Sequence, residues 1–140
     1  MVIVLDTNVL VAATLSPFGA SFQILTLLPQ QRFELLLSVP LMLEYEGVLK
    51  REDMRAKSCL TVEEVDSLLD MLAAVGTPCT PFFQWRPQLP DPDDEMLLEL
   101  AANGRADAIV TVNIRHFLPA AGTFGVEVLR PGEFLRRLRS

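Results

Sequence analysis

The sequence has few of the residues that crosslink a chain or bind soft metals. It contains only two cysteines, Cys59 and Cys79, and a single histidine, His116. Two cysteines are too few for a disulfide framework, so we expect a reduced, cytoplasmic protein. The same scarcity excludes a zinc site built from cysteine and histidine.

Long hydrophobic runs are also absent. No apolar run approaches the roughly 18 residues that a membrane-spanning helix needs, so we expect no membrane segment. We expect no signal peptide either, because residues 1–15 lack a basic start and are interrupted by Asp6 and Asn8. Half of the 140 residues are nonetheless apolar, and the mean hydropathy is +0.31. This composition excludes a disordered tail, and the length predicts a single domain over residues 1–140.

The excess of basic residues that general nucleic-acid binders carry is missing. Twelve Lys and Arg stand against 18 Asp and Glu, which gives a net charge of −6. The charges are unevenly spread, with acids gathered in residues 91–99 and arginines in residues 115–139. A tight acidic site beside a basic C-terminal segment fits these facts as well as a uniformly acidic surface does, so composition leaves both open.

Short apolar runs alternate with helical patterns along the chain. Buried parallel strands are predicted at residues 2–5, 35–39 and 108–112, with an edge strand at residues 126–129. Helices are predicted between them, at residues 21–28, 40–51, 61–76, 91–104 and 131–139. This alternation predicts an α/β fold with a mainly parallel sheet.

The segment of residues 77–92 breaks the alternation because it is rich in proline. It predicts a short strand followed by a rigid surface loop. We expect its aromatic residues, Phe82, Phe83 and Trp85, to make core or dimer contacts rather than to stack on bases.

Polar residues follow two of the predicted strands, where an open parallel sheet binds its ligands. Asp6 comes directly after the first strand, and Asn113 comes just after the strand at residues 108–112. Both are therefore expected at the same edge of the sheet.

Glu44 lies three residues after Leu41 and four before Val48, so it borders the apolar stripe of its helix. A carboxylate there is costly unless it is paired, protonated or bound to a cation.

Asp94 lies on the inward stripe of its helix, because Leu97 and Leu98 follow it at spacings of three and four. Its neighbours Asp91 and Asp93 are explained by helix capping and helix polarity instead. Inward carboxylates and an amide that meet at one edge suit Mg²⁺ or Mn²⁺. Such ions can activate water and stabilise charge on a phosphodiester.

Four segments in order, residues 5–10, 38–49, 91–98 and 106–113, resemble the PIN-domain family, and in particular its bacterial and archaeal VapC-like toxins. The resemblance covers nearly the whole chain. It implies a small three-layer α/β/α domain and a Mg²⁺- or Mn²⁺-dependent ribonuclease activity. It also implies a homodimer and a cognate antitoxin protein that keeps the toxin inactive.

The resemblance also implies roles for single residues. The catalytic, metal-binding acids would be Asp6, Glu44 and Asp94. Asn8 matches a polar residue that supports the first acid, and Thr111 matches a hydroxyl residue near the site. Asn113 stands where the family usually has Asp. An amide still offers a carbonyl oxygen to the metal, but it lacks one negative charge and should weaken the binding of a second ion.

Our first interpretation is therefore a metal-dependent endoribonuclease that hydrolyses RNA phosphodiesters, the toxin of a toxin–antitoxin pair. The alternative is a catalytically weak or inactive PIN-like module that binds RNA or protein, which Asn113 and the acidic composition favour. A third interpretation, an aspartyl-phosphate phosphatase or receiver domain using Asp6, ranks far lower. Such proteins need a second Asp where this chain has Asn8, and a late lysine where none follows Lys57.

Two further groups are left open. His116 is expected to be a surface or loop residue rather than a general base. The basic C-terminal residues, Arg136, Arg137 and Arg139, are expected at a solvated helix end that could also touch RNA phosphates.

Overall fold

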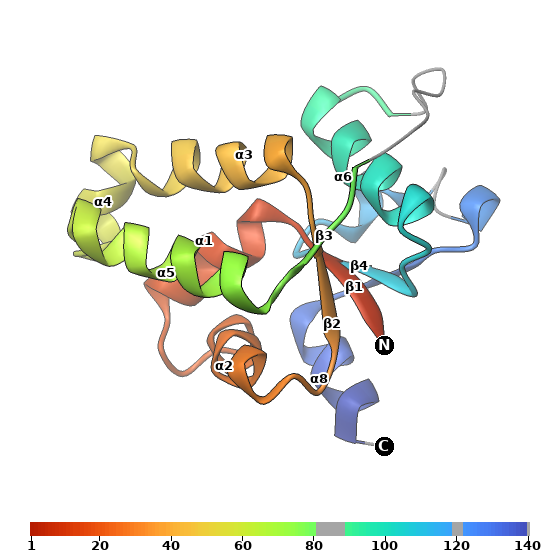
Figure 1. Ribbon diagram of the computed structural model, residues 1–140, viewed down its shortest axis with the longest axis horizontal. Helices are drawn as coiled ribbons and strands as arrows, with labels where there is room; N and C mark the ends of the chain where they lie inside the picture. The colour runs from red at the N-terminus through yellow and green to blue at the C-terminus, as the bar shows by residue number, and fades with distance from the viewer. Residues whose placement is uncertain (81–88, 119–121, 140) are drawn as a thin grey trace.

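Five parallel strands form one sheet in the order β3-β2-β1-β4-β5 (Figure 1). The computed structural model describes residues 1–80, 89–118 and 122–139. The strands are β1 (Val2–Leu5), β2 (Glu34–Leu37), β3 (Thr77–Pro78), β4 (Ala108–Val110) and β5 (Glu127–Leu129). This arrangement confirms the predicted α/β fold with its parallel sheet.

The burial of the strands explains their sequence patterns. In the central strand β1, Ile3, Val4 and Leu5 are fully buried, because other strands flank it and helices cover both of its faces. The predicted edge strand is confirmed as β5, where only Leu129 is buried. The short strand predicted in the proline-rich segment is β3, whereas Phe82, Phe83 and Trp85 lie outside the described residues.

The helices have the following bounds: α1 (Thr7–Leu15), α2 (Ala20–Leu27), α3 (Val39–Leu49), α4 (Glu52–Ser58), α5 (Val62–Val75), α6 (Pro92–Asn103) and α8 (Pro131–Arg139). The capping box at Thr61 and Glu64 begins α5 as predicted. The helix predicted at residues 40–51 was wrong in its end, because α3 stops at Leu49 and α4 begins after Arg51.

Two predicted strands were too long at their carboxyl ends. The strand at residues 35–39 ends at Leu37, because Ser38 caps α3 by accepting a hydrogen bond from the Leu41 N–H. The strand at residues 108–112 ends at Val110, where the chain turns towards the 3₁₀ helix Ile114–His116.

The elements form three layers. In Figure 1, helices α1 to α5 lie on one side of the sheet and α6 lies on the other, where it contacts β1, β2 and β4. Helix α8 packs against α2 and β5. The strand order reverses between β1 and β4, and in doubly wound sheets ligands bind in the crevice at this switch point.

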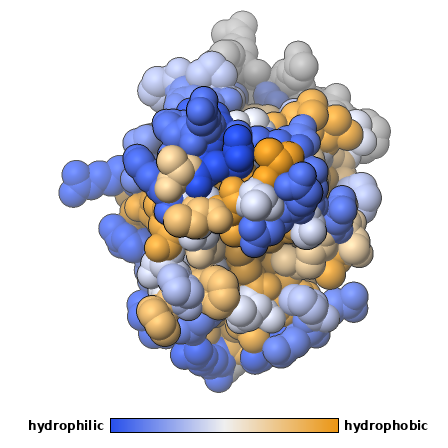
Figure 2. Space-filling view, turned by 90° about the vertical axis from the view of Figure 1, so that its left-hand side faces the viewer, coloured by the Kyte–Doolittle hydropathy of each residue, from blue (hydrophilic) through white to orange (hydrophobic). Residues whose placement is uncertain are grey.

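The surface carries exposed hydrophobic side chains. Figure 2, which shows the side of the molecule where α4 lies, has hydrophobic side chains across its centre. A groove bounded by α1, α2, α4 and α5 is lined in part by Leu15, Phe22, Leu60 and Leu68. Phe18, in the α1–α2 connection, is 92% exposed.

None of the helices in the described ranges is by itself long and apolar enough to cross a membrane. One bent pair, Thr7–Leu15 with Ala20–Gln30, meets the criteria of length and composition only when joined across a 104° bend.

Tyr45 fixes α3 against the end of β1. Its side chain is fully buried, and its hydroxyl donates a hydrogen bond of 2.5 Å to the carbonyl oxygen of Leu5. Glu44 precedes Tyr45 on α3, and Asp6 follows Leu5 on the strand. This bond therefore sets the distance between the elements that carry two predicted site acids.

We predict that Tyr45→Phe lowers the free energy of unfolding by about 1–3 kcal/mol, because it removes a buried hydrogen bond and leaves its acceptor. Urea unfolding followed by circular dichroism measures this change. The control is Thr26→Val, which removes an exposed hydroxyl bond to Gln23 and should change stability by less than about 0.5 kcal/mol. Equal effects of the two substitutions would contradict the structural role of Tyr45.

Candidate metal-binding site at the sheet switch point

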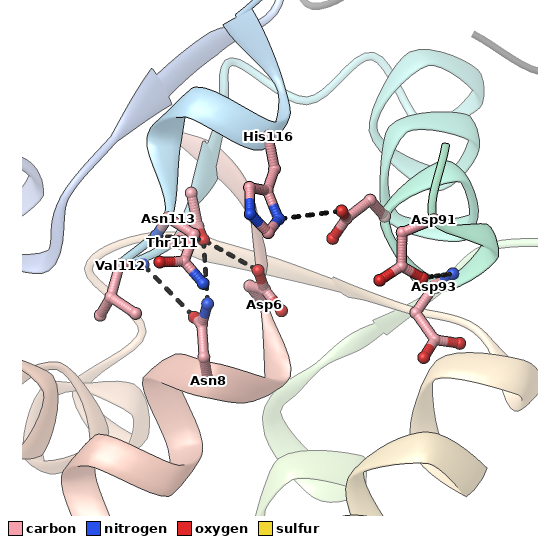
Figure 3. A network of polar contacts seen from close by, with 9 residues as sticks. Asp6, Asn8, Asp91, Asp93, Thr111, Val112, Asn113 and His116 are labelled. Carbon is pink, nitrogen blue, oxygen red and sulfur yellow. Dashed lines mark hydrogen bonds and ion pairs between the residues drawn. The ribbon is translucent and has the colours of Figure 1, made fainter. Parts of the chain in front are cut away.

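Asp6 and Thr111 meet where the carboxyl ends of β1 and β4 lie side by side (Figure 3). The Asp6 N–H donates to the Val110 carbonyl oxygen at 2.9 Å, which fixes the backbone directly after β1. The Thr111 Oγ1 then donates to Asp6 Oδ2 at 2.8 Å. Asp6 is 9% exposed and Thr111 is fully buried.

The hydrogen bonds that the Thr111 hydroxyl accepts determine the direction of its own O–H proton. Its Oγ1 accepts the backbone N–H of Asn113 at 3.0 Å and the side-chain Nδ2 of Asn8 at 3.2 Å. With both acceptor sites used, the hydroxyl proton is directed at Asp6. Asn8 Oδ1 in turn accepts the Val112 N–H at 3.3 Å. The structure thus brings both predicted supporting residues, Asn8 and Thr111, to the first predicted acid.

Thr7 orients Glu44. The Thr7 Oγ1 donates to Glu44 Oε2 at 2.6 Å, a bond that joins the first residue of α1 to α3. Thr7 is 6% exposed, whereas Glu44 is half-buried. Thr7 was not among the predicted site residues. The signal that identifies it is its position: a hydroxyl residue directly after Asp6 starts its helix at the edge of the sheet.

Asp94 reaches the site from the first turn of α6. It is 9% exposed, as its predicted place on the inward stripe requires, and its Oδ2 lies 3.1 Å from His116 Nδ1. His116 is exposed at the end of a 3₁₀ helix, as expected, but its imidazole also contacts a site acid, which was not predicted. Asp91 caps α6 by accepting the Asp93 N–H at 2.9 Å, so its predicted capping role is confirmed.

Burial, with repulsion from neighbouring carboxylates, raises the pKa values of all three acids. For Asp6, burial is the largest cause; the Thr111 hydroxyl opposes it, and the charge of Asp94 adds to it. Burial also raises the pKa of Glu44, against the Thr7 hydroxyl and with the charges of Asp93 and Asp6. The pKa of Asp94 is raised by burial and by the charge of Asp91, while His116 opposes the rise. The charge of Asp94 thus disfavours ionisation of Asp6, and the charge of Asp6 disfavours ionisation of Glu44.

A divalent cation fits this donor set in its chemistry. Carboxylate oxygens are the ligands that Mg²⁺ and Mn²⁺ prefer, and a bound cation would stabilise the ionised forms that burial and neighbouring charges disfavour. As the side chains are placed, no three of the described Asp, Glu, His and Cys residues converge closely enough to hold an ion. Asn113 contacts the network through its backbone N–H, and its side chain is exposed.

Comparison with known proteins identifies the family. The PIN domain profile matches residues 2–115, which include every acid of the site. The chain belongs to the PIN domain family. No curated protein matches it. A solved structure with a similar fold is VapBC2 from Rickettsia felis bound to a DNA fragment from their promoter, with 17% sequence identity and a TM-score of 0.60. The match covers 93% of this PIN chain and 98% of the other chain.

The basic C-terminal residues do not lie beside the acids. Arg137 pairs with Glu127 at 2.6 Å, at the amino end of β5, and Arg139 donates to Gln23 on α2. The site lies at the opposite, carboxyl edge of the sheet. Of the arginines in residues 115–139, Arg137 and Arg139 therefore lie away from the acids, whereas Arg115 is next to His116 in the chain and Arg130 directly follows β5.

We predict that Asp6→Asn makes the metal-free PIN domain more stable than the wild type at neutral pH. The pKa of Asp6 is higher in the folded protein than in the unfolded chain. Ionised Asp6 therefore destabilises the fold at pH values above the folded-state pKa, and this destabilisation disappears at pH values below the unfolded-state pKa, where Asp6 is protonated in both states. The stability gained by the variant should therefore shrink as pH falls through the acid range. Thermal melts in EDTA between pH 4 and 7.5 measure the difference.

The matched control is Asp70→Asn, which makes the same exchange at an exposed position of α5. A stability difference between wild type and Asp6→Asn that stays constant with pH, or grows on acidification, would refute the raised pKa of Asp6 as its cause.

Proposed function

We propose that this PIN domain, residues 1–140, is a metal-dependent endoribonuclease that hydrolyses RNA phosphodiesters. PIN domains are typically nucleases and generally use divalent metals. The observation that carries the proposal is the electrostatic coupling of acids from separate elements, of which Asp6 and Asp94 are buried and Glu44 is half-buried. Asp6 is coupled to Asp94 and Glu44 to Asp6 at the switch point of the sheet, where such folds bind ligands.

In this proposal Asp6, Glu44 and Asp94 hold Mg²⁺ or Mn²⁺, with the Asn113 amide as a fourth, uncharged donor. Such an ion, when bound, lowers the pKa of a coordinated water and stabilises the charge of the phosphodiester. The residues of the chain supply the geometry: Thr111 and Asn8 fix Asp6, and Thr7 fixes Glu44. The acids act as metal holders, and no side chain is assigned as a separate general base.

We also propose that the protein is a VapC-like toxin, held inactive by a cognate antitoxin in the cytoplasm, and that it forms a homodimer. The similar solved structure is VapBC2 bound to a DNA fragment from their promoter. We carry over the antitoxin partner to this chain as part of the proposal, and we do not carry over the DNA. The hydrophobic groove bounded by α1, α2, α4 and α5 supports a protein partner.

We predict that the protein cleaves a structured, end-labelled RNA in Mn²⁺ and not in EDTA. Asp6→Asn and Asp94→Asn should each reduce cleavage by more than about 100-fold, because loss of a ligand exceeds the roughly 10–100-fold cost of losing a ligand's hydrogen-bond partner. Denaturing gel electrophoresis over a time course measures the rates.

Asp70→Asn, purified identically, is the matched control and should cleave like the wild type. Cleavage that persists in both site variants belongs to a contaminant and provides no support for a nuclease activity of this protein. An absence of cleavage, together with no rise in melting temperature on adding Mn²⁺, would refute the nuclease.

The second candidate function is a PIN-like module that binds RNA or protein and cleaves weakly or not at all. The observation that favours it is Asn113, which removes a negative charge where the family usually has one and has an exposed side chain. An uncharged donor binds a cation less strongly than a carboxylate does, so a second ion in particular would be held weakly.

We predict that Asn113→Asp tightens Mn²⁺ binding several-fold and raises the cleavage rate at limiting Mn²⁺, because it adds a carboxylate beside the other acids. Calorimetric titration and cleavage assays over a series of Mn²⁺ concentrations measure the two effects. Asn103→Asp, at the far end of α6, is the control for the added charge. If both substitutions change binding equally, Asn113 is not part of the site.

A further inference from the structure

Each of the three predicted metal-binding carboxylates has one oxygen in contact with a neighbouring hydroxyl or imidazole, and Glu44 also has a side-chain contact with Asp93. The three contacts are Thr111 Oγ1 to Asp6 Oδ2 at 2.8 Å, Thr7 Oγ1 to Glu44 Oε2 at 2.6 Å, and His116 Nδ1 to Asp94 Oδ2 at 3.1 Å. The contacting residues come from different elements, yet each lies against one oxygen of its acid. This pattern restricts how each carboxylate can approach a cation.

The number of oxygens that a carboxylate offers distinguishes divalent cations. Ca²⁺ takes six to eight oxygen ligands at about 2.3–2.6 Å and accepts carboxylates through both oxygens. Mg²⁺ demands octahedral geometry at about 2.0–2.1 Å, keeps several waters and is bound through few carboxylates. A carboxylate whose second oxygen is held by a hydrogen bond suits the smaller ion better.

We propose that the Thr7 hydroxyl makes Glu44 a ligand through one oxygen only, and that it thereby selects Mg²⁺ and Mn²⁺ over Ca²⁺. This inference rests on the proposed function, because it takes Glu44 as a metal ligand. Thr7 is a positioning residue in this account: its hydroxyl touches the ligand and not the ion.

Thr7 is the best placed of the three contacting residues for this effect. Its 2.6 Å bond is the shortest of the three, and short O–H···O⁻ bonds to carboxylates are the stronger ones. Its 6% exposure leaves little room for water to replace the hydroxyl. His116, by contrast, has a side chain that is 53% exposed, and Thr111 shares its hydroxyl among Asp6, Asn8 and Asn113.

Three substitutions at Thr7 separate the hydroxyl from the rest of the side chain. Thr7→Val keeps the shape of the side chain and removes the hydroxyl donor. Thr7→Ala also removes the donor but leaves a smaller side chain. Thr7→Ser keeps the donor. Thr14→Val is the matched control, because Thr14 lies on the same helix and donates to the Val11 carbonyl oxygen, not to an acid. Circular dichroism melts identify the variants that fold.

The experiment is calorimetric titration of each metal-free protein with Mn²⁺, Mg²⁺ and Ca²⁺ alone. We expect the ratio of Ca²⁺ to Mn²⁺ affinity to rise by about 10-fold in Thr7→Val and Thr7→Ala, the lower end of what loss of a ligand's hydrogen-bond partner does to metal affinity. Thr7→Ser and Thr14→Val should keep the wild-type ratio.

The outcomes separate this inference from the proposed function. Equal loss of affinity for all three ions in Thr7→Val and Thr7→Ala would show a merely structural role and overturn the selectivity, as would an unchanged ratio. In both cases metal-dependent RNA cleavage would still support the nuclease. If the wild type binds none of the three ions, the inference and the proposed function fall together.

Discussion

The burial of carboxylates close to other negative charges is the constraint on which the candidate site depends. Asp6 follows the central strand directly, so its carboxylate cannot leave the edge of the sheet without moving the core. Its charge acts on Glu44 from α3, and the charge of Asp94 from α6 acts on it in turn. Hydroxyl donors compensate only part of this burial, as the raised pKa values indicate. Without a bound cation, the negative charge of these acids is therefore unfavourable, and binding of a proton or a cation would reduce it.

Most of the fold follows from periodicity in the sequence, and the failures have physical causes. The strands were found because they are short apolar runs buried on both faces, and α5 was found through its capping box. Helix α1 was missed. Val9, Leu10 and Ala13 form its buried face, but Val11, Ala12 and Leu15, which are less buried, are also apolar, so it lacks the polar stripe that marks a surface helix. A buried helix segment and a buried strand look alike in sequence.

The acids of the site were predictable, but the residues that orient them were less so. Strand ends and helix stripes indicated Asp6, Glu44 and Asp94 because these positions conflict with the usual place of a carboxylate. Thr7 and His116 show no such conflict, because a buried threonine and an exposed histidine are both common in proteins. Their contacts depend on how α1 meets α3 and how the loop after β4 meets α6, which only the tertiary structure determines.

The position of the C-terminal arginines has a consequence for how a polyanion would bind. Arg137 and Arg139 contact Glu127, at the amino end of β5, and Gln23 on α2, so these two arginines do not offset the acids at the other edge. A phosphate approaching the metal-free acids meets like charge. If the proposed cation and a polyanion both bind at this edge, their binding is therefore thermodynamically linked. Whatever factor the cation adds to the affinity for the polyanion, the polyanion adds to the affinity for the cation.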